Sequence, residues 1–236
     1  METIEQRLDG LEKKMQSRVV EAEEIRLLDK SGSVGCSLSV SGQERNLILR
    51  NDAGQARVRI SMPKGGTQIE LLDGAGRGHV YISATDGGAS VILVDRDGKN
   101  RAQMTLKDDD GPWLALYDDA EKARAQLGAV RKATSLWLAD ENGKPRIKMQ
   151  TGKTSTCLEL TDENGRTRGA LVLGLDAPNL LLFDANTNIR VTLAAPEEGP
   201  SLALHDSQGE IRLHVAVQDE EPTVSFLSQD GECRQL

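Results

Sequence analysis

Apolar and polar positions alternate along nearly the whole chain, and the pattern returns with a fixed period. In five copies it reads LILRNDAGQAR, VILVDRDGKNR, LWLADENGKPR, LELTDENGRTR and LALHDSQGEIR. The acidic position of the ten copies falls at Asp29, Asn51, Asp73, Asp95, Asp118, Asp140, Asp162, Asp184, Asp206 and Ser228. Eight of the nine spacings are 22 residues, and the one from Asp95 to Asp118 is 23. Copies that keep one register in this way predict a repeat protein.

The apolar positions predict two β-strands in each repeat. The first strand has apolar residues four and two positions before the Asp, such as Leu158 and Leu160. The second has them mostly seven and always nine positions after the Asp, wherever the chain reaches that far, such as Val58 and Ile60. Alternation with a period of two is typical of a strand that buries one face. We therefore expect a mainly β protein.

The Asp-x-x-Gly segment between the two strands predicts a tight turn. An Asp carboxylate accepts hydrogen bonds from nearby backbone N–H groups, and Gly adopts the left-handed conformation without steric cost. A four-residue loop also brings the apolar positions of both strands to one face. The predicted turn residues are Asp29, Asp73, Asp95, Asp118, Asp140, Asp162, Asp184, Asp206, Gly32, Gly54, Gly76, Gly98, Gly143, Gly165, Gly209 and Gly231. Glu121 and Thr187 replace the Gly in two copies, and in the second we expect Asn186 or Asn188 to be left-handed.

The other connection in each repeat is polar and rich in Gly, Pro and Asp, as in PKGGT and DDDGP, which predicts a looser turn on the opposite edge. Residues 19–236 then form an elongated antiparallel β-meander of about ten 22-residue hairpin repeats. At ~4.8 Å per strand, about twenty strands extend roughly 95 Å. Because no amphipathic helix follows the strands to cover their apolar face, we expect the sheet to coil on itself or to pack on copies of itself.

Residues 1–18 predict a short helix, opened by a capping box at Thr3 and Gln6. Two heptads of apolar residues with 4-3-4 spacing point to a coiled coil and to these oligomerisation residues: Ile4, Leu8, Leu11 and Met15. We favour a parallel homotrimer, packed as a trimeric β-prism, because three one-sided sheets can close a triangular apolar interior. The alternative is a short amphipathic helix docked on the first repeat, which would be marginal alone with Gly10 inside it.

Composition and charge narrow the range of expected partners and cellular locations. The formal net charge is -8, and acidic and basic residues are mixed along the chain without a basic stripe, so we expect no nucleic acid partner. No stretch approaches the roughly 18 apolar residues of a membrane span. Charged residues precede any apolar run at the N-terminus, unlike a secretory signal. The default location is cytoplasmic, while a phage or injection-system particle, or surface delivery by a route without an N-terminal signal, stays open.

Candidate chemistry is sparse. Cys36, Cys157 and Cys233 lie far apart without a CxxC pair, which argues against a disulfide framework or a zinc site. The turn that starts at Asp95 is the most similar to a calcium loop, but Lys99 follows where further oxygen ligands are needed. We expect no metal and no cofactor.

The recurrent basic residue six positions after the Asp is expected on the outer face, where it can interact with nearby carboxylates, including those of adjacent turns. It is present as Arg57, Arg101, Arg124, Arg146, Arg168, Arg190, Arg212 and Arg234. His79, His205 and His214 occupy different repeat positions and build no cluster. Because no nucleophile–His–carboxylate set, P-loop or dinucleotide fingerprint is present, we predict that the protein is not an enzyme.

The motif Leu-x-Leu-x-Asp-x-x-Gly-x-x-Arg behind a predicted coiled coil resembles uncharacterised bacterial repeat proteins. The resemblance covers nearly the whole chain and implies no function. The turns in LALYDDAEKAR and TDENGRTR are similar to those of YD/RHS repeats, which build shells around toxins, but this chain lacks their aromatic positions and is too short for a shell. MORN repeats share the hairpin and a comparable period, and their aromatic and Gly pattern is missing.

These patterns predict a non-catalytic structural or interaction protein, a self-associating β-repeat shaft that serves as a spike, fibre or spacer with another protein at one end. The alternative is a monomeric β-solenoid or five-bladed propeller that binds glycans or peptides. Propeller blades would make odd and even repeats differ, which they do not. Trp113, Trp137 and Tyr81 do not share a repeat position, as a sugar platform would require. We therefore favour the shaft.

Overall fold

The structure is a computed structural model that describes residues 22–130, 133–174, 177–229 and 233–235. These residues contain twenty β-strands and no helix. The chain divides into two compact units, Met1–Asp86 and Gly87–Leu236. The strands of the first unit are β1 (Glu24–Leu28), β2 (Val34–Ser41), β3 (Glu44–Arg50), β4 (Ala56–Ser61), β5 (Gly66–Leu72) and β6 (Gly78–Thr85).

The second unit contains the other fourteen strands. They are β7 (Gly88–Val94), β8 (Asn100–Lys107), β9 (Gly111–Tyr117), β10 (Ala123–Val130), β11 (Ala133–Ala139), β12 (Pro145–Thr151), β13 (Thr156–Thr161), β14 (Thr167–Leu173), β15 (Pro178–Phe183), β16 (Ile189–Ala194), β17 (Ser201–His205), β18 (Ile211–Gln218), β19 (Glu221–Leu227) and β20 (Cys233–Gln235).

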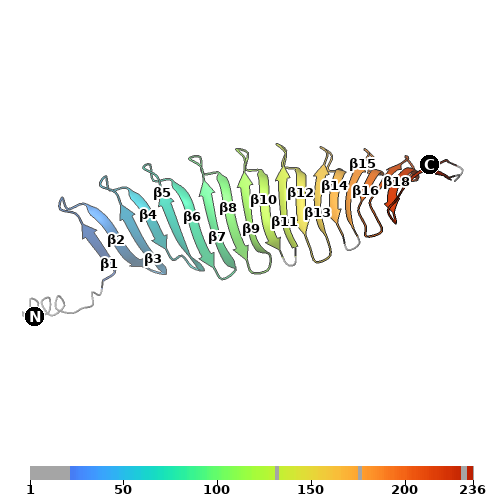
Figure 1. Cartoon of the computed structure of the whole chain (residues 1–236). Helices are drawn as coiled ribbons and strands as arrows, with labels where there is room; N and C mark the ends of the chain where they lie inside the picture. The colour runs from blue at the N-terminus through green and yellow to red at the C-terminus, as the bar shows by residue number, and fades with distance from the viewer. Residues whose placement is uncertain (1–21, 131–132, 175–176, 230–232, 236) are drawn as a thin grey trace, which may run out of the picture. The chain divides into compact units, whose positions relative to one another are not determined.

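Within each unit, every strand pairs antiparallel with the strand that follows it in sequence, so each unit is an open, single-layer meander (Figure 1). The predicted mainly β fold and its repeated antiparallel hairpins are confirmed. Residues 1–18, which carry the predicted coiled coil, lie outside the described residues. The trimeric prism stays a prediction.

Strand pairing places the repeated apolar residues opposite one another. Ile147 pairs with Leu160, and Met149 pairs with Leu158. Directly paired residues share a face of a sheet. One face therefore collects the residues four and two positions before each turn Asp and seven, nine and eleven positions after it, and we call this the apolar face. Its rows exist because the 22-residue period preserves the strand register from one repeat to the next.

The opposite face, which we call the mixed face, combines polar, small and aromatic residues. On it, the Arg59 guanidinium and the Glu70 carboxylate form an ion pair across β4 and β5, with Nη1 and Oε2 2.6 Å apart. Apart from Gly169 on the apolar face, the buried residues in the described chain are small ones on this face, such as Ala115 at 1% and Ala170 at 6% exposure. No large side chain among the described residues is fully buried. A single layer of this kind has no hydrophobic core of its own.

Gly88→Ala is expected to lower the free energy of unfolding by about 1–3 kcal/mol, the usual cost of a strained backbone conformation. Gly88 opens β7 with φ +141°, and a Cβ added there would clash with the carbonyl oxygen of Leu106 on β8. The neighbouring Gly87→Ala is the matched control, because nothing lies within 4 Å of a Cβ added at Gly87. Urea unfolding of the two variants measures the difference, and equal stabilities would contradict this reading of the turn.

Candidate interaction surface

The tight turns share one hydrogen-bond pattern. In the turn of Asp162, the carboxylate oxygen Oδ1 accepts the backbone N–H groups of Asn164 (2.9 Å) and Arg166 (3.0 Å), and the Gly165 N–H donates to the Asp162 carbonyl oxygen (2.9 Å). The hydrogen bond from the Arg166 N–H holds the pKa of the Asp162 carboxyl below its ordinary value, while partial desolvation opposes the shift. Asn51 makes the same two side-chain hydrogen bonds with its amide oxygen. The turn therefore requires a side-chain oxygen that accepts these two hydrogen bonds, and either a carboxylate or an amide can supply it.

The predicted Gly positions carry the left-handed residues of these turns. Those in the described chain have φ between +73° and +88°. In the two turns without Gly, the substituted residue itself is left-handed, with φ +58° at Glu121 and +69° at Thr187. The expectation that Asn186 or Asn188 would take this role is corrected, because the register of the turn fixes the position regardless of residue type. Gly231 lies outside the described residues.

Basic side chains link each turn of the second unit to the next. Arg146 Nη1 lies 3.4 Å from Asp140 Oδ2 of its own turn, and its Nε donates to the Thr161 carbonyl oxygen of the following repeat (2.8 Å). Lys144 Nζ donates to the Glu163 carbonyl oxygen, also in the following repeat (2.9 Å). Sequence reasoning predicted the carboxylate partner and missed the carbonyl groups. The sequence interpretation had already placed the adjacent turn within reach of this side chain, but it expected only that turn's carboxylates.

The Arg–carboxylate pair recurs through the second unit, at Arg101, Arg124, Arg146, Arg168, Arg190 and Arg212. In the first unit, His79 stands at this position and lies 3.2 Å from Asp73 Oδ2. Gly35 occupies it in the first repeat, and Arg57 follows the uncharged Asn51 in the second.

Asp162→Ala is expected to lower the melting temperature by a few degrees, because two backbone N–H groups of the turn lose their acceptor and Arg168 loses its carboxylate, 3.7 Å away. Asp162→Asn should cost much less, since Asn51 shows that an amide oxygen can replace the carboxylate. Thermal unfolding of both variants gives the comparison. An Asn variant as unstable as the Ala variant would show that charge, and not the hydrogen bonds, holds the turn.

The apolar face is exposed along both units. Of the 27 large apolar side chains that are exposed among the described residues, all but Leu28 and Ile211 belong to it, with exposures between 36% and 61%. Apolar patches larger than a few hundred Å² mark interaction surfaces in proteins. The apolar face is therefore the candidate functional site.

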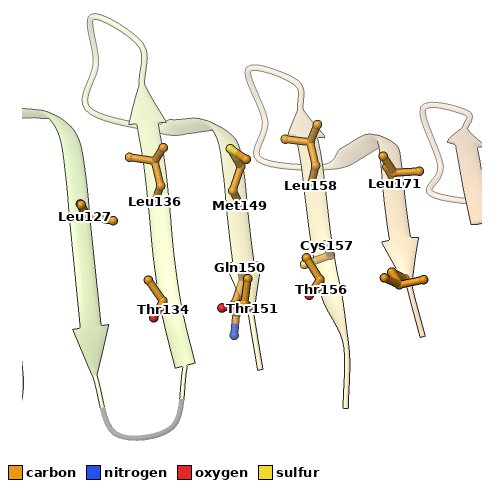
Figure 2. A pocket seen from close by; sticks show the side chains of 11 residues that line it. Leu127, Thr134, Leu136, Met149, Gln150, Thr151, Thr156, Cys157, Leu158 and Leu171 are labelled. Carbon is orange, nitrogen blue, oxygen red and sulfur yellow. The ribbon is translucent and has the colours of Figure 1, made fainter. Parts of the chain in front are cut away.

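One part of the apolar face is hollowed. A trough of about 430 Å³ crosses β10 to β14, and its lining is almost entirely apolar. Leu127, Leu136, Met149, Leu158 and Leu171 form a row along it, one on each strand (Figure 2). Three threonines from β11, β12 and β13 border it nearer the loose turns: Thr134, Thr151 and Thr156.

The residues that the structure describes gather no metal-binding cluster. These contain no group of three or more His, Cys, Asp and Glu side chains that could hold a metal ion. Cys36, Cys157 and Cys233 are free thiols, and Cys157 borders the trough. Nor does the described part of the chain include a helix long and apolar enough to cross a membrane. All four residues predicted to mediate oligomerisation lie outside the described ranges: Ile4, Leu8, Leu11 and Met15.

Comparisons with known proteins identify no family, because neither a family model nor a curated protein matches the chain. Among solved structures, a mutant of S. aureus TarM in complex with fondaparinux, alpha-GlcNAc-glycerol and UDP is 11% identical over 73% of this chain and 23% of that chain, with a TM-score of 0.17. A porin-like protein from Bacteroides uniformis is 8% identical over 85% of this chain and 91% of that chain, with a TM-score of 0.15. Such low TM-scores carry no argument about this protein.

Proposed function

We propose that this protein is a non-catalytic structural protein that self-associates through its apolar face and forms a shaft: a spike, a fibre or a spacer. The observation that carries the proposal is the unbroken repetition of exposed Leu, Ile, Val and Met side chains on one face of each unit. A second copy is the occupant that this surface fits best, because it offers the same flat rows with the same spacing.

Burial supplies the driving force. Each repeat contributes about four large apolar side chains, and full burial of one stabilises by about 1.5–3 kcal/mol. Because many of these side chains are 36–61% exposed in the single chain, a large share of that free energy is still available to association. Stable interfaces typically bury about 1,600 Å² in total.

Strand length favours a trimeric prism. Packed sheets lie about 10 Å apart, so each sheet sits about 5 Å from the middle of a shared interior. A triangle whose sides lie 5 Å from its centre has sides of roughly 17 Å, and strands of six to eight residues span about 20–26 Å. Three sheets can therefore meet with apolar rows inside and polar turns at the corners. In this proposal residues 1–18 form a parallel coiled coil that sets the register, and another protein binds at one end.

Molecular mass in solution, measured by light scattering on the full chain, tests the proposal. We expect a species of three times the 25.6 kDa chain mass. A stable dimer would support self-association but contradict the proposed trimeric prism. A monodisperse monomer would overturn the proposed function, and a monomer that binds lipid vesicles or a glycan array would assign the apolar or the mixed face to a different partner.

A further inference from the structure

The trough across β10 to β14 has a sequence origin. The residues eleven positions after the turn Asp are often large and apolar, as Leu106 and Leu173 are. Across β11, β12 and β13 the same row runs through Thr134, Thr151 and Thr156, which pair directly with one another. Because these three consecutive side chains are short, the apolar face is depressed where they lie. The trough of about 430 Å³ is beside them.

Symmetry prevents the copies from filling this trough with one another. In a closed cyclic assembly whose axis runs along the stack of strands, the same residues of every copy stand at the same height. Trough then faces trough, and the larger residues of the row, such as Leu106 and Leu173, face their own equivalents. The assembly would enclose an apolar chamber lined by Leu136, Met149 and Leu158 of each copy. Chambers of this kind stay dry and accept apolar molecules.

We infer that this chamber binds the alkyl chain of a long-chain fatty acid, an inference that rests on the proposed self-association. The trough crosses five strands, which at ~4.8 Å per strand spacing makes it roughly 19 Å long and suits an extended alkyl chain. Because the exposed lining of the trough is almost entirely apolar, burying an alkyl chain there leaves few polar groups of the protein without hydrogen-bonding partners. The exposed Lys153 lies in the turn between β12 and β13, at the threonine edge beside the middle of the trough, and its positive charge attracts an anionic ligand to this part of the sheet.

Calorimetric titration of palmitate into the delipidated full-length protein, below the micelle concentration, tests the inference. We expect saturable binding to the assembly, at least ten-fold weaker binding to Thr151→Leu, which fills the trough, and several-fold weaker binding to Lys153→Glu. Thr67→Leu is the matched control, because Thr67 lies in the same row on β5, paired with Ala84 and away from the trough. Its affinity should equal that of the unmodified protein.

The outcomes separate this inference from the proposed function. An assembly of the expected mass that binds no palmitate, or whose binding survives Thr151→Leu, would overturn the chamber and leave the self-associating shaft intact. A monomer would overturn both, whether or not it binds palmitate, since the chamber exists only between copies. Light scattering on each variant confirms that Thr151→Leu, which adds only apolar atoms to an apolar face, still assembles.

Discussion

Leu160→Asp is expected to break the assembly and to lower its melting temperature steeply. Leu160 lies on the apolar face of β13, opposite Ile147 and beside Gly169. If copies pack on this face, the substitution buries an unpaired carboxylate, which costs several kcal/mol in each copy. In a single free sheet the same side chain is 48% exposed and would cost little. Light scattering and melting curves at several protein concentrations distinguish the two cases, because only an assembly melts at a concentration-dependent temperature.

Glu159→Gln is the matched control for this variant. Glu159 is the next residue on β13 and faces the mixed side, opposite Lys148 on β12 and Ala170 on β14. The amide keeps the size of the side chain and avoids the like-charge pair that a Lys would form with Lys148. We expect unchanged mass and a melting temperature close to that of the unmodified protein. Equal damage from both substitutions would show that the apolar face is not the one that copies share.

The sequence predicted the strands and turns because the 22-residue period repeats every local signal ten times. A single Leu-x-Leu-x-Asp would be a weak indication, whereas ten in register leave one antiparallel pairing that keeps Leu158 opposite Met149 and Leu160 opposite Ile147. The Asx hydrogen bonds followed from the same Asp at the same place. Local chemistry and global pairing agree here, which is the condition under which a pattern alone determines a fold.

Other features depended on three-dimensional neighbours that no local pattern names. The hydrogen bond from Arg146 Nε to the Thr161 carbonyl oxygen joins residues 15 positions apart, and it exists because adjacent strands place successive turns side by side. The trough arises from Thr134 and Thr156, which occupy the same position in successive repeats, and from Thr151 at another position. The three become one row only once their strands pair. Left-handed Thr187 shows the converse, a backbone geometry imposed by its repeat against the preference of its own side chain.

Acidification is expected to destabilise the protein through its turns. The pKa of each turn carboxyl at Asp29, Asp73, Asp95, Asp118, Asp140, Asp162, Asp184 and Asp206 is lowered from the ordinary 3.8. At Asp95, Asp118 and Asp162 the largest cause is the hydrogen bond from the backbone N–H four residues later. A group whose pKa is lower in the folded state stabilises the fold above its unfolded pKa, and this stabilisation is lost as the pH falls through the folded pKa. The free energy of unfolding should therefore be level near neutral pH and fall increasingly below about pH 4.

A triple variant, Asp118→Asn, Asp140→Asn and Asp162→Asn, separates the turns from other acidic groups. Each amide keeps the turn acceptor, as Asn51 does, but no longer titrates. Each also gives up the charge beside the Arg six residues later, so a modest loss of stability at neutral pH is expected. Below pH 4 the variant should lose stability less steeply than the unmodified protein, because fewer protons are taken up on unfolding. Urea unfolding in pH steps at constant ionic strength measures both slopes. Parallel slopes would mean that acid acts elsewhere than on these turns.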